Sequence, residues 1–427
     1  FPIILLGTLL GAFVYRWARE AHGSLAGLLA MGLYAFAPNL LAHTRLVTTD
    51  LAVTASGFIA LYAFWRYLRW PTTWRMGLAS LALGLALAAK LSALLLIPVM
   101  GLLALLESRH RLIQMLRDGV ALLLIAALVI WAFYRFEVRP WPGSTLPLPA
   151  TTYLLNLRTL IGHAGRGHGA FLMGQVSMHG WWTYFPLAFL LKTPPLTLLL
   201  LGVAAWDTVR RKRWRGDAPL VLFPMAYFSF ALASSLNIGY RYILPILPFI
   251  IVYAAKVAGL VWLRPVWLRR YALPVLMVLY AAGSLWLHPH YLAYFNLLAG
   301  GPEDGYRYLV DSNLDWGQDL KLLKVYLDER GVDDVWLGYL GTADPAYYGI
   351  HYRPLFAPGT SDPAGDFSPV NPTSGWYAIS ATVLQGPYSL EPDLFDWFRR
   401  HEPVAKIGCS IFVYRVEPDP DPPAWLG

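Results

Sequence analysis

Ionisable side chains in short polar turns between long apolar stretches are the part of this sequence that could carry chemistry. A guanidinium group presents a planar fork of donors to phosphate oxygens, an ammonium group supplies a compact positive charge, and a carboxylate can take a proton. Charged groups at membrane depth are costly, and where they occur they mark a site or a cavity. The candidates are Asp50 for a catalytic role, Arg45, Lys90 and Arg241 for phosphate binding, and His43, His163, His168, His179 and Lys192 for substrate contacts.

The turn from His43 to Asp50 brings an imidazole, a guanidinium and a carboxylate into one short segment. This convergence favours a functional site over a structural turn. Two structural alternatives remain open. Thr48, Thr49 or Asp50 could cap the following helix, and Arg45 could extend toward lipid headgroups.

Lys90 and Arg241 are the other two cations in this group. Lys90 stands in the apolar sequence LALAAKLSALLL, where it needs either a polar partner or a helix end near the membrane surface. Arg241 lies in the turn NIGYRY, where it could bind phosphate or pair with an acidic group of a soluble domain.

A long connector at 137–182 carries three histidines among glycines, and Lys192 follows it closely. His163, His168 and His179 do not have the spacing of a compact zinc site on a helix. Glycine-rich backbone suits a loop that closes over a ligand, in which these side chains would contact substrate. The alternative is a flexible, partly ordered loop without a binding role. Lys192 could face the same cavity or the membrane surface.

The segment DSNLDWGQD begins at Asp311 and resembles the start of a calcium-binding loop. Its glycine comes one place late, and Leu322 occupies the twelfth position, where such a loop needs a bidentate glutamate. The sequence instead predicts a capping box, with Asp315 as N-cap and Gln318 at the third helical position.

Composition places the chain in the membrane. Of 427 residues, 57% are hydrophobic and only 14% are charged, whereas about a quarter of a soluble domain is charged. The formal charge of +8 resides mainly in short loops between apolar segments, which indicates membrane orientation and contact with anionic lipids rather than nucleic-acid binding. Cys409 is the single cysteine, which excludes an internal disulfide and a cysteine-based metal cluster.

Hydropathy predicts about ten membrane spans, each needing roughly 20 apolar residues. They lie at 1–17, 24–41, 50–65, 76–89, 91–107, 118–136, 183–207, 218–235, 242–261 and 271–288. Arg and Lys cluster in every second connector, and cytoplasmic loops carry such an excess. All these clusters of Arg and Lys fall on one side of the membrane if Lys90 lies at a turn on the other side. The basic connectors are then expected on the cytoplasmic face, and the candidate residues on the extracytoplasmic face. The basic connectors contain Arg16, Arg19, Arg66, Arg69, Arg75, Arg109, Arg111, Arg117, Arg210, Arg211, Lys212, Arg213, Arg215, Lys256, Arg264, Arg269 and Arg270.

The sequence therefore predicts a polytopic α-helical membrane domain at 1–288 and a soluble extracytoplasmic α/β domain at 289–427. Charge rises and hydropathy falls near residue 289. The second domain is expected to contain a helix at 317–330, strands at DVWLGYL, GWYAISA and KIGCSIFVYRV, and a short helix near LFDWFRR.

The chain resembles bacterial family-39 glycosyltransferases of the GT-C class, related to protein O-mannosyltransferases and the lipid A aminoarabinose transferase. The resemblance is carried, from about residue 40 to 320, by RLVTTD, LALGLALAAKLSALLLIP, GQVSMHGWWTYFPLAFLLKTP, NIGYRYILPILPF and YRYLVDSNLDWGQDL. It implies a GT-C-like fold in the bacterial cytoplasmic membrane. It also implies sugar transfer from a polyprenyl-phosphate donor to a protein, lipid or glycan acceptor.

The resemblance also suggests roles for individual residues. The spacing of Arg45 and Asp50 matches a pattern whose arginine holds the donor phosphate. Asp50 would organise the site, and Lys90, which matches a lysine of the family, would assist with charge. The family's acidic catalytic pair lies in a loop after its first helix, so the main general base is expected upstream of Phe1.

Two questions stay open at this stage. Several transferases of this class bind divalent cations, but no metal-ligand set stands out in the sequence. A non-catalytic scaffold or accessory subunit of a larger membrane assembly is the alternative to an enzyme. A transporter is less favoured, because neither inverted halves nor paired broken helices are evident.

Overall fold

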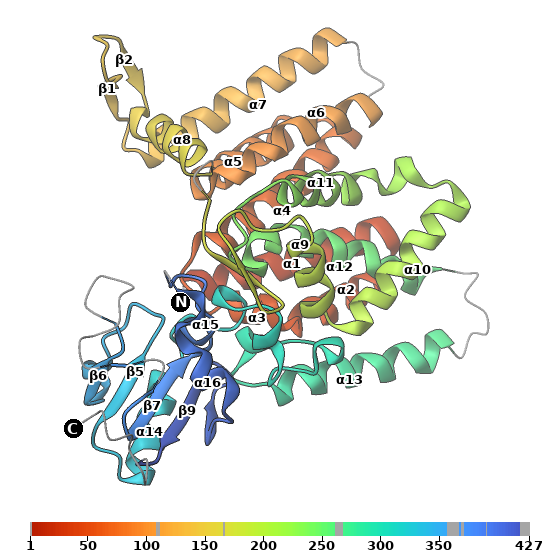
Figure 1. Cartoon of the computed structure of the whole chain (residues 1–427). Helices are drawn as coiled ribbons and strands as arrows, with labels where there is room; N and C mark the ends of the chain where they lie inside the picture. Colours follow the sequence, from red (N-terminus) through yellow and green to blue (C-terminus); the bar gives the residue numbers. More distant parts are fainter. Residues whose placement is uncertain are drawn as a thin grey trace. The chain divides into compact units, whose positions relative to one another are not determined.

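The chain is described by a computed structural model that covers residues 2–107, 112–164, 167–260, 268–356, 367–368, 371–389 and 391–418 (Figure 1). It divides into two compact units. Unit 1 comprises Phe1–Arg166, Thr193–Ser234 and Arg241–Tyr291, and unit 2 comprises Gly167–Lys192, Ser235–Tyr240 and Leu292–Gly427. Of the predicted basic connectors, Arg109, Arg111 and Arg264 lie outside the described residues.

Unit 1 is helical, because its sequence consists of long apolar runs rich in Leu and Ala. One small antiparallel ribbon pairs β1 (Val138–Pro140) with β2 (Pro147–Pro149). In the described part of this unit, the α-helices are interrupted or extended by the 3₁₀ segments η1 (Leu91–Leu95), η2 (Tyr240–Ile246, whose first residue is in unit 2) and η3 (Lys256–Gly259). The α-helices are α1 (Pro2–His22), α2 (Ser24–Ala35), α3 (Pro38–His43), α4 (Thr49–Arg69), α5 (Thr73–Ala89), α6 (Leu96–Glu107), α7 (Leu112–Phe133), α8 (Thr151–Ala164), α10 (Pro195–Arg211), α11 (Trp214–Leu232), α12 (Leu247–Ala255) and α13 (Leu273–Trp286).

The structure confirms a mostly helical membrane protein but not the ten predicted spans. Among the described residues, three helices are long and apolar enough to cross a membrane: Thr49–Arg69, Ile113–Phe133 and Tyr240–Gly259. The bent pair Tyr184–Lys192 and Pro195–Arg211 gives a fourth if it is counted as one span. The other predicted spans are also helical. Of these helices, α2, α5, α6 and α13 are shorter than 18 residues.

Aromatic side chains connect four helices of unit 1. The ring of Phe58 in α4 lies 4.9 Å from Trp17 in α1 and 4.8 Å from Phe249 in α12. Phe223 in α11 lies 5.1 Å from Phe249. These large buried rings fix the helices that carry the candidate residues, because aromatic pairs add to the stabilisation that burial provides.

Unit 2 contains helix α9 (Tyr184–Lys192), the hairpin of β3 (Ala170–Leu172) and β4 (Gln175–Ser177), and a five-stranded sheet. The sheet order is β6-β5-β7-β9-β8, with bounds β5 (Val335–Gly338), β6 (Tyr352–Pro354), β7 (Gly375–Ser380), β8 (Ala405–Ile407) and β9 (Ile411–Val416). Strands β6, β5 and β7 are parallel neighbours, whereas β9 is antiparallel to β7 and β8.

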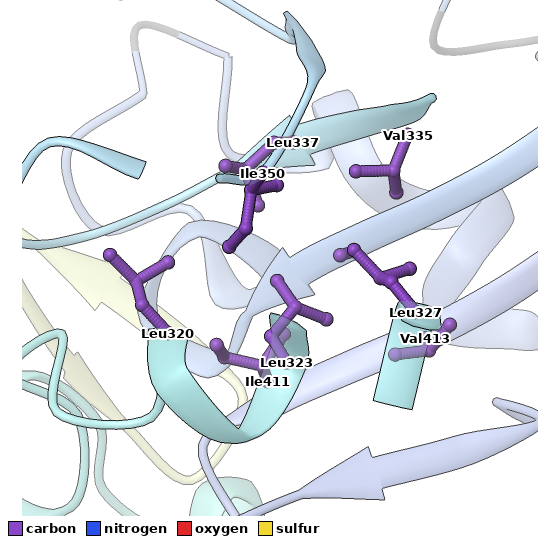
Figure 2. Close-up of a cluster of buried hydrophobic side chains, with 9 residues drawn as sticks. Leu320, Leu323, Leu327, Val335, Leu337, Ile350, Ile411 and Val413 are labelled. Carbon is purple, nitrogen blue, oxygen red and sulfur yellow. The ribbon is translucent and has the colours of Figure 1, made fainter. Parts of the chain in front are cut away.

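Helix α14 (Leu320–Arg330) packs on this sheet through leucines on one helical face (Figure 2). Leu320, Leu323 and Leu327 are spaced three and four residues apart, so their side chains share a stripe. They meet alternate residues of the strands, including Leu337 in β5 and Val413 in β9. This cluster forms a hydrophobic core between α14 and the sheet. Two short helices, α15 (Ala381–Gln385) and α16 (Asp396–Arg400), follow β7.

Two local expectations for this region were wrong. Helix α14 begins at Leu320 with Asp319 as its N-cap, so Asp315 does not cap it. The Asp315 carboxylate instead accepts hydrogen bonds from the backbone N–H groups of Gly317 and Thr382. The single strand expected over 406–416 is a hairpin, because the chain reverses at Gly408 and Cys409, both with positive φ.

Candidate functional site

Asp50 and Lys90 form a buried ion pair in unit 1. Asp50 is in the first turn of α4, where a negative charge is favourable beside the positive end of the helix dipole. Its Oδ1 atom accepts a hydrogen bond of 2.7 Å from Lys90 Nζ. The Asp50 side chain is 3% exposed and that of Lys90 is 24% exposed. The carboxylate is therefore used in a tertiary contact rather than in capping its own helix.

Lys90 reaches Asp50 because α5 ends one residue before it. Its backbone is extended, and η1 begins at Leu91. This break between two apolar helical segments places the lysine at a helix end rather than in a helix interior.

Arg241 joins the same carboxylate from a distant part of the chain. Its Nη1 atom lies 3.9 Å from Asp50 Oδ2, and its side chain is 21% exposed. The ring of Tyr242 lies beneath both cations, with Lys90 Nζ at 4.4 Å and the Arg241 guanidinium carbon at 5.5 Å from its centroid. Cation–π attraction of this kind holds a cation in place without neutralising it.

The resulting cluster has the chemistry of an anion site. Two cations of different shape stand beside one carboxylate and remain partly exposed. A guanidinium group can bind two oxygens of a phosphate, while an ammonium group supplies a point charge. The Asp50 carboxylate holds both cations close to each other, one at each of its oxygens.

Arg45 and His43 come from the same turn as Asp50. Arg45 is exposed and donates a hydrogen bond of 2.9 Å from Nη1 to the carbonyl of Pro289. His43 is buried at the last residue of α3. The carboxylate and the guanidinium of the turn 43–50 thus have different partners.

The histidine-rich connector contains an ordered hairpin in unit 2. His168 Nδ1 lies 2.9 Å from the carbonyl oxygen of Gly169, and its ring meets that of Tyr388 edge-on at 5.3 Å. His179 is exposed, and its backbone N–H bonds Ser177 Oγ. His163 lies in the last turn of α8, and its side chain is outside the described residues.

Lys192 is fully enclosed within unit 2. Its Nζ atom donates to the carbonyl oxygens of Leu292 and Tyr294, each at 3.0 Å, and to that of Asn313. It also lies 4.4 Å from the ring centroid of Phe295. Three backbone carbonyls thus surround the ammonium group, so its geometry supports a structural role.

Most residues of the DSNLDWGQD segment are buried in unit 2. Asn313 is completely buried, accepts a hydrogen bond from the N–H of Tyr240 and donates to the hydroxyl of Tyr184, each at 2.9 Å. Burial raises the pKa of Asp315 to about 7, although hydrogen bonds donated by Ser380, Thr382 and Gly317 to its carboxylate oppose this rise. Its buried polar groups join strands, turns and α9 into one network.

Tyr242 is the functional candidate that sequence reasoning missed. Its place beside Arg241 was the available signal, because an aromatic ring next to a cation can support it. Ser92 was missed as well, two residues after Lys90, where it accepts a hydrogen bond of 3.0 Å from the Tyr227 hydroxyl. Only the fold brings α11, which carries Tyr227, to this position.

The described residues contain no group of three or more His, Cys, Asp or Glu side chains arranged to hold a metal ion. At the candidate site, both Asp50 oxygens already face cations. The site therefore fits an anion better than a divalent cation.

Comparisons with known proteins find a family match for the N-terminal part of the chain. Residues 1–134 match the model of the dolichyl-phosphate-mannose-protein mannosyltransferase family. No curated protein matches the chain. Two similar solved structures are those of ArnT from Cupriavidus metallidurans, bound to undecaprenyl phosphate and in the apo state. Their TM-scores are 0.48 and 0.47, and each is 15% identical, with 96% of this chain and 82% of that chain covered. The family match over residues 1–134 confirms the resemblance inferred from the sequence for that part of the chain: this is a multi-pass membrane protein that is similar, over those residues, to the dolichyl-phosphate-mannose-protein mannosyltransferase family.

Proposed function

We propose that this protein is a membrane glycosyltransferase that moves a sugar from a polyprenyl-phosphate donor to an acceptor on the extracytoplasmic face. The observation that carries the proposal is the cluster in which Lys90 and Arg241 meet the buried carboxylate of Asp50. The family match at residues 1–134 supports the same reaction class.

In this reaction the bond between the sugar's anomeric carbon and the phosphate oxygen breaks, and a bond to the acceptor forms. The acceptor proton passes to a carboxylate general base, and the polyprenyl phosphate leaves with the bond's electron pair. Lys90 and Arg241 stabilise the charge that develops on the leaving phosphate. Attack from the face opposite the phosphate inverts the sugar configuration.

Asp50 acts in this scheme as a positioning residue rather than as the base. Both of its oxygens face cations, so the carboxylate holds Lys90 and Arg241 in place before the donor binds. Preorganisation of this kind reduces the cost of arranging charges when the phosphate arrives. The resemblance assigns the base to a different loop.

The test measures binding of undecaprenyl phosphate to the full-length protein in detergent, with undecaprenol as the uncharged control lipid. We expect Lys90→Gln and Arg241→Gln each to weaken binding by about ten- to a hundredfold, because a charge-assisted hydrogen bond contributes roughly 1.5–3 kcal/mol. Undecaprenol should bind wild type and variants alike. Lys324→Gln, a change at a partly exposed lysine in α14, serves as the matched control.

The same measurement of undecaprenyl phosphate binding is made on variants of Asp50 and Arg45. Asp50→Asn should weaken undecaprenyl phosphate binding, and Asp50→Glu should restore part of it, whereas a role in folding alone would not distinguish the lipid phosphate from undecaprenol. Arg45→Gln tests whether the exposed guanidinium also contacts phosphate. Wild-type affinity in both Lys90→Gln and Arg241→Gln would place the phosphate site elsewhere.

A further inference from the structure

A cation-rich cavity lies in unit 1, away from the cluster around Asp50. It has a volume of about 240 Å³ and is lined by residues of α1, α4 and α5. Three of the lining residues are arginines, one from each helix: Arg16, Arg66 and Arg75. Arginine side chains from three different helices seldom meet in one cavity without a negatively charged ligand or partner.

This cavity is at the opposite end of the helices from the candidate site. Asp50 begins α4 and Arg66 lies near its end, 16 residues later, which corresponds to about 24 Å along the helix. Helix α5 has Arg75 in its first turn and ends just before Lys90. The hydrocarbon core of a bilayer is about 30 Å thick. The two cation clusters therefore belong to opposite membrane surfaces.

In the part of the chain that the structure describes, Glu20 is the one carboxylate that partly compensates the three arginines. Glu20 lies 3.2 Å from Arg16 Nε and 3.6 Å from Arg66 Nε, and it accepts a hydrogen bond of 2.8 Å from Tyr62. Arg75 donates to the carbonyl of Trp70 and is paired with no carboxylate among the described residues. The cavity therefore carries an excess of positive charge.

Apolar side chains also line the cavity, and further apolar side chains continue from them along α1 and α5. Phe13 of α1 and Leu78 of α5 line it. Leu9 and Leu81 are each one helical turn farther from the arginines, on the same helix faces, and are 47% and 46% exposed. Trp74 at the rim is 76% exposed, as is typical of a side chain at the membrane interface.

We propose that this cavity binds the phosphate headgroup of an anionic phospholipid, whose acyl chains lie along Leu9 and Leu81. The arginine forks match a phosphate group, and the excess positive charge favours an anionic over a zwitterionic headgroup. The apolar track favours a lipid over free phosphate, which has no chain to place there. This lipid site is in the leaflet opposite the sugar donor and is independent of the proposed reaction.

Native mass spectrometry of the full-length protein, released from detergent with phosphatidylglycerol or phosphatidylcholine, tests the proposal. We expect wild type to retain phosphatidylglycerol in preference to phosphatidylcholine. Arg16→Gln and Arg75→Gln should each weaken phosphatidylglycerol retention about fivefold, because a basic residue near an anionic surface contributes about that factor. Arg16→Lys should keep most of the retention. Arg66 is left intact because it also holds Glu20.

Arg117→Gln is the matched control, since Arg117 lies in the second turn of α7, which packs against α5, and pairs with Asp118 outside the cavity. It should retain phosphatidylglycerol like the wild type. Equal loss in Arg117→Gln and Arg16→Gln would overturn the proposal, because retention would then report surface charge in general. Protection from thermal unfolding by inorganic phosphate as strong as that by phosphatidylglycerol would also overturn it, in favour of a free-anion site.

Discussion

Asp50 and Asp315 are both buried carboxylates, but different groups surround them. Asp50 faces Lys90 and Arg241, so burial of its charge is offset by opposite charges. Asp315 is bonded by hydroxyl and backbone N–H groups instead, and burial raises its pKa to about 7. At the scale of single residues, the first arrangement suits a site that binds an anion, and the second makes the stability of unit 2 depend on pH.

The pKa of Asp315 predicts the direction of that dependence. The pKa is raised from 3.8 in the unfolded chain to about 7 in the folded one, so the folded state holds the proton more tightly. Stability is then greatest below pH 4 for this group and is lost as pH rises toward 7, by about 1.4 kcal/mol per pH unit at most. Above pH 7 this contribution no longer changes.

Hydrogen–deuterium exchange of the β7 and β9 peptides, corrected for intrinsic exchange rates, measures this in the full-length protein. Asp315→Asn should make the local unfolding free energy less dependent on pH between 4 and 7. Asp328→Asn, an exposed change in α14, should leave the dependence as in wild type. A pH profile that persists unchanged in Asp315→Asn would show that another group is responsible.

At the scale of elements, the contact between α5 and α7 depends on a glycine. A Cβ atom added to Gly84 would lie 2.6 Å from Val129 Cβ and 2.9 Å from the carbonyl oxygen of Ala126. Small residues let membrane helices approach closely in this way. Gly77, in the same helix, has no such neighbour within 4 Å.

Alanine at these two glycines should therefore have effects of opposite sign. Gly84→Ala should destabilise the protein by about 1–3 kcal/mol, because α7 must shift to relieve the overlap. Gly77→Ala should be neutral or stabilising by up to about 1 kcal/mol, because alanine favours helix more than glycine does. Thermal unfolding of both variants in the same detergent gives the comparison. Destabilisation by Gly77→Ala equal to that by Gly84→Ala would contradict the packing argument.

At the scale of the whole molecule, the arrangement of charge predicts orientation in the membrane. Lys212 is exposed in a cluster of basic residues between α10 and α11, and such clusters stay in the cytoplasm. Tyr347 is 84% exposed in unit 2, which we expect on the extracytoplasmic face.

Cysteine labelling in a Cys409→Ser background tests this orientation. A membrane-impermeant maleimide added to intact cells should label Tyr347→Cys and leave Lys212→Cys unlabelled. Inside-out vesicles should show the reverse. Labelling of both positions from one side would mean that the proposed orientation is wrong.

The sequence by itself determined the class of protein, the helical segments, the mixed helix and strand content of the C-terminal region and the family resemblance. These properties depend on local composition and on spacing along the chain, which hydropathy and charge patterns record directly. The same patterns identified Asp50, Lys90 and Arg241 as candidate site residues, because a charge within apolar sequence requires a partner.

Only the tertiary structure decided which partner each charge has. Asp50 meets Lys90, 40 residues away in the chain, whereas Arg45, in the same turn as Asp50, contacts Pro289 instead. Lys192, also predicted to face a ligand, is enclosed by three carbonyls. The physical reason is that a buried charge is stabilised by whatever opposite charge or dipole the packing brings within a few ångströms, and packing joins residues that are distant in sequence.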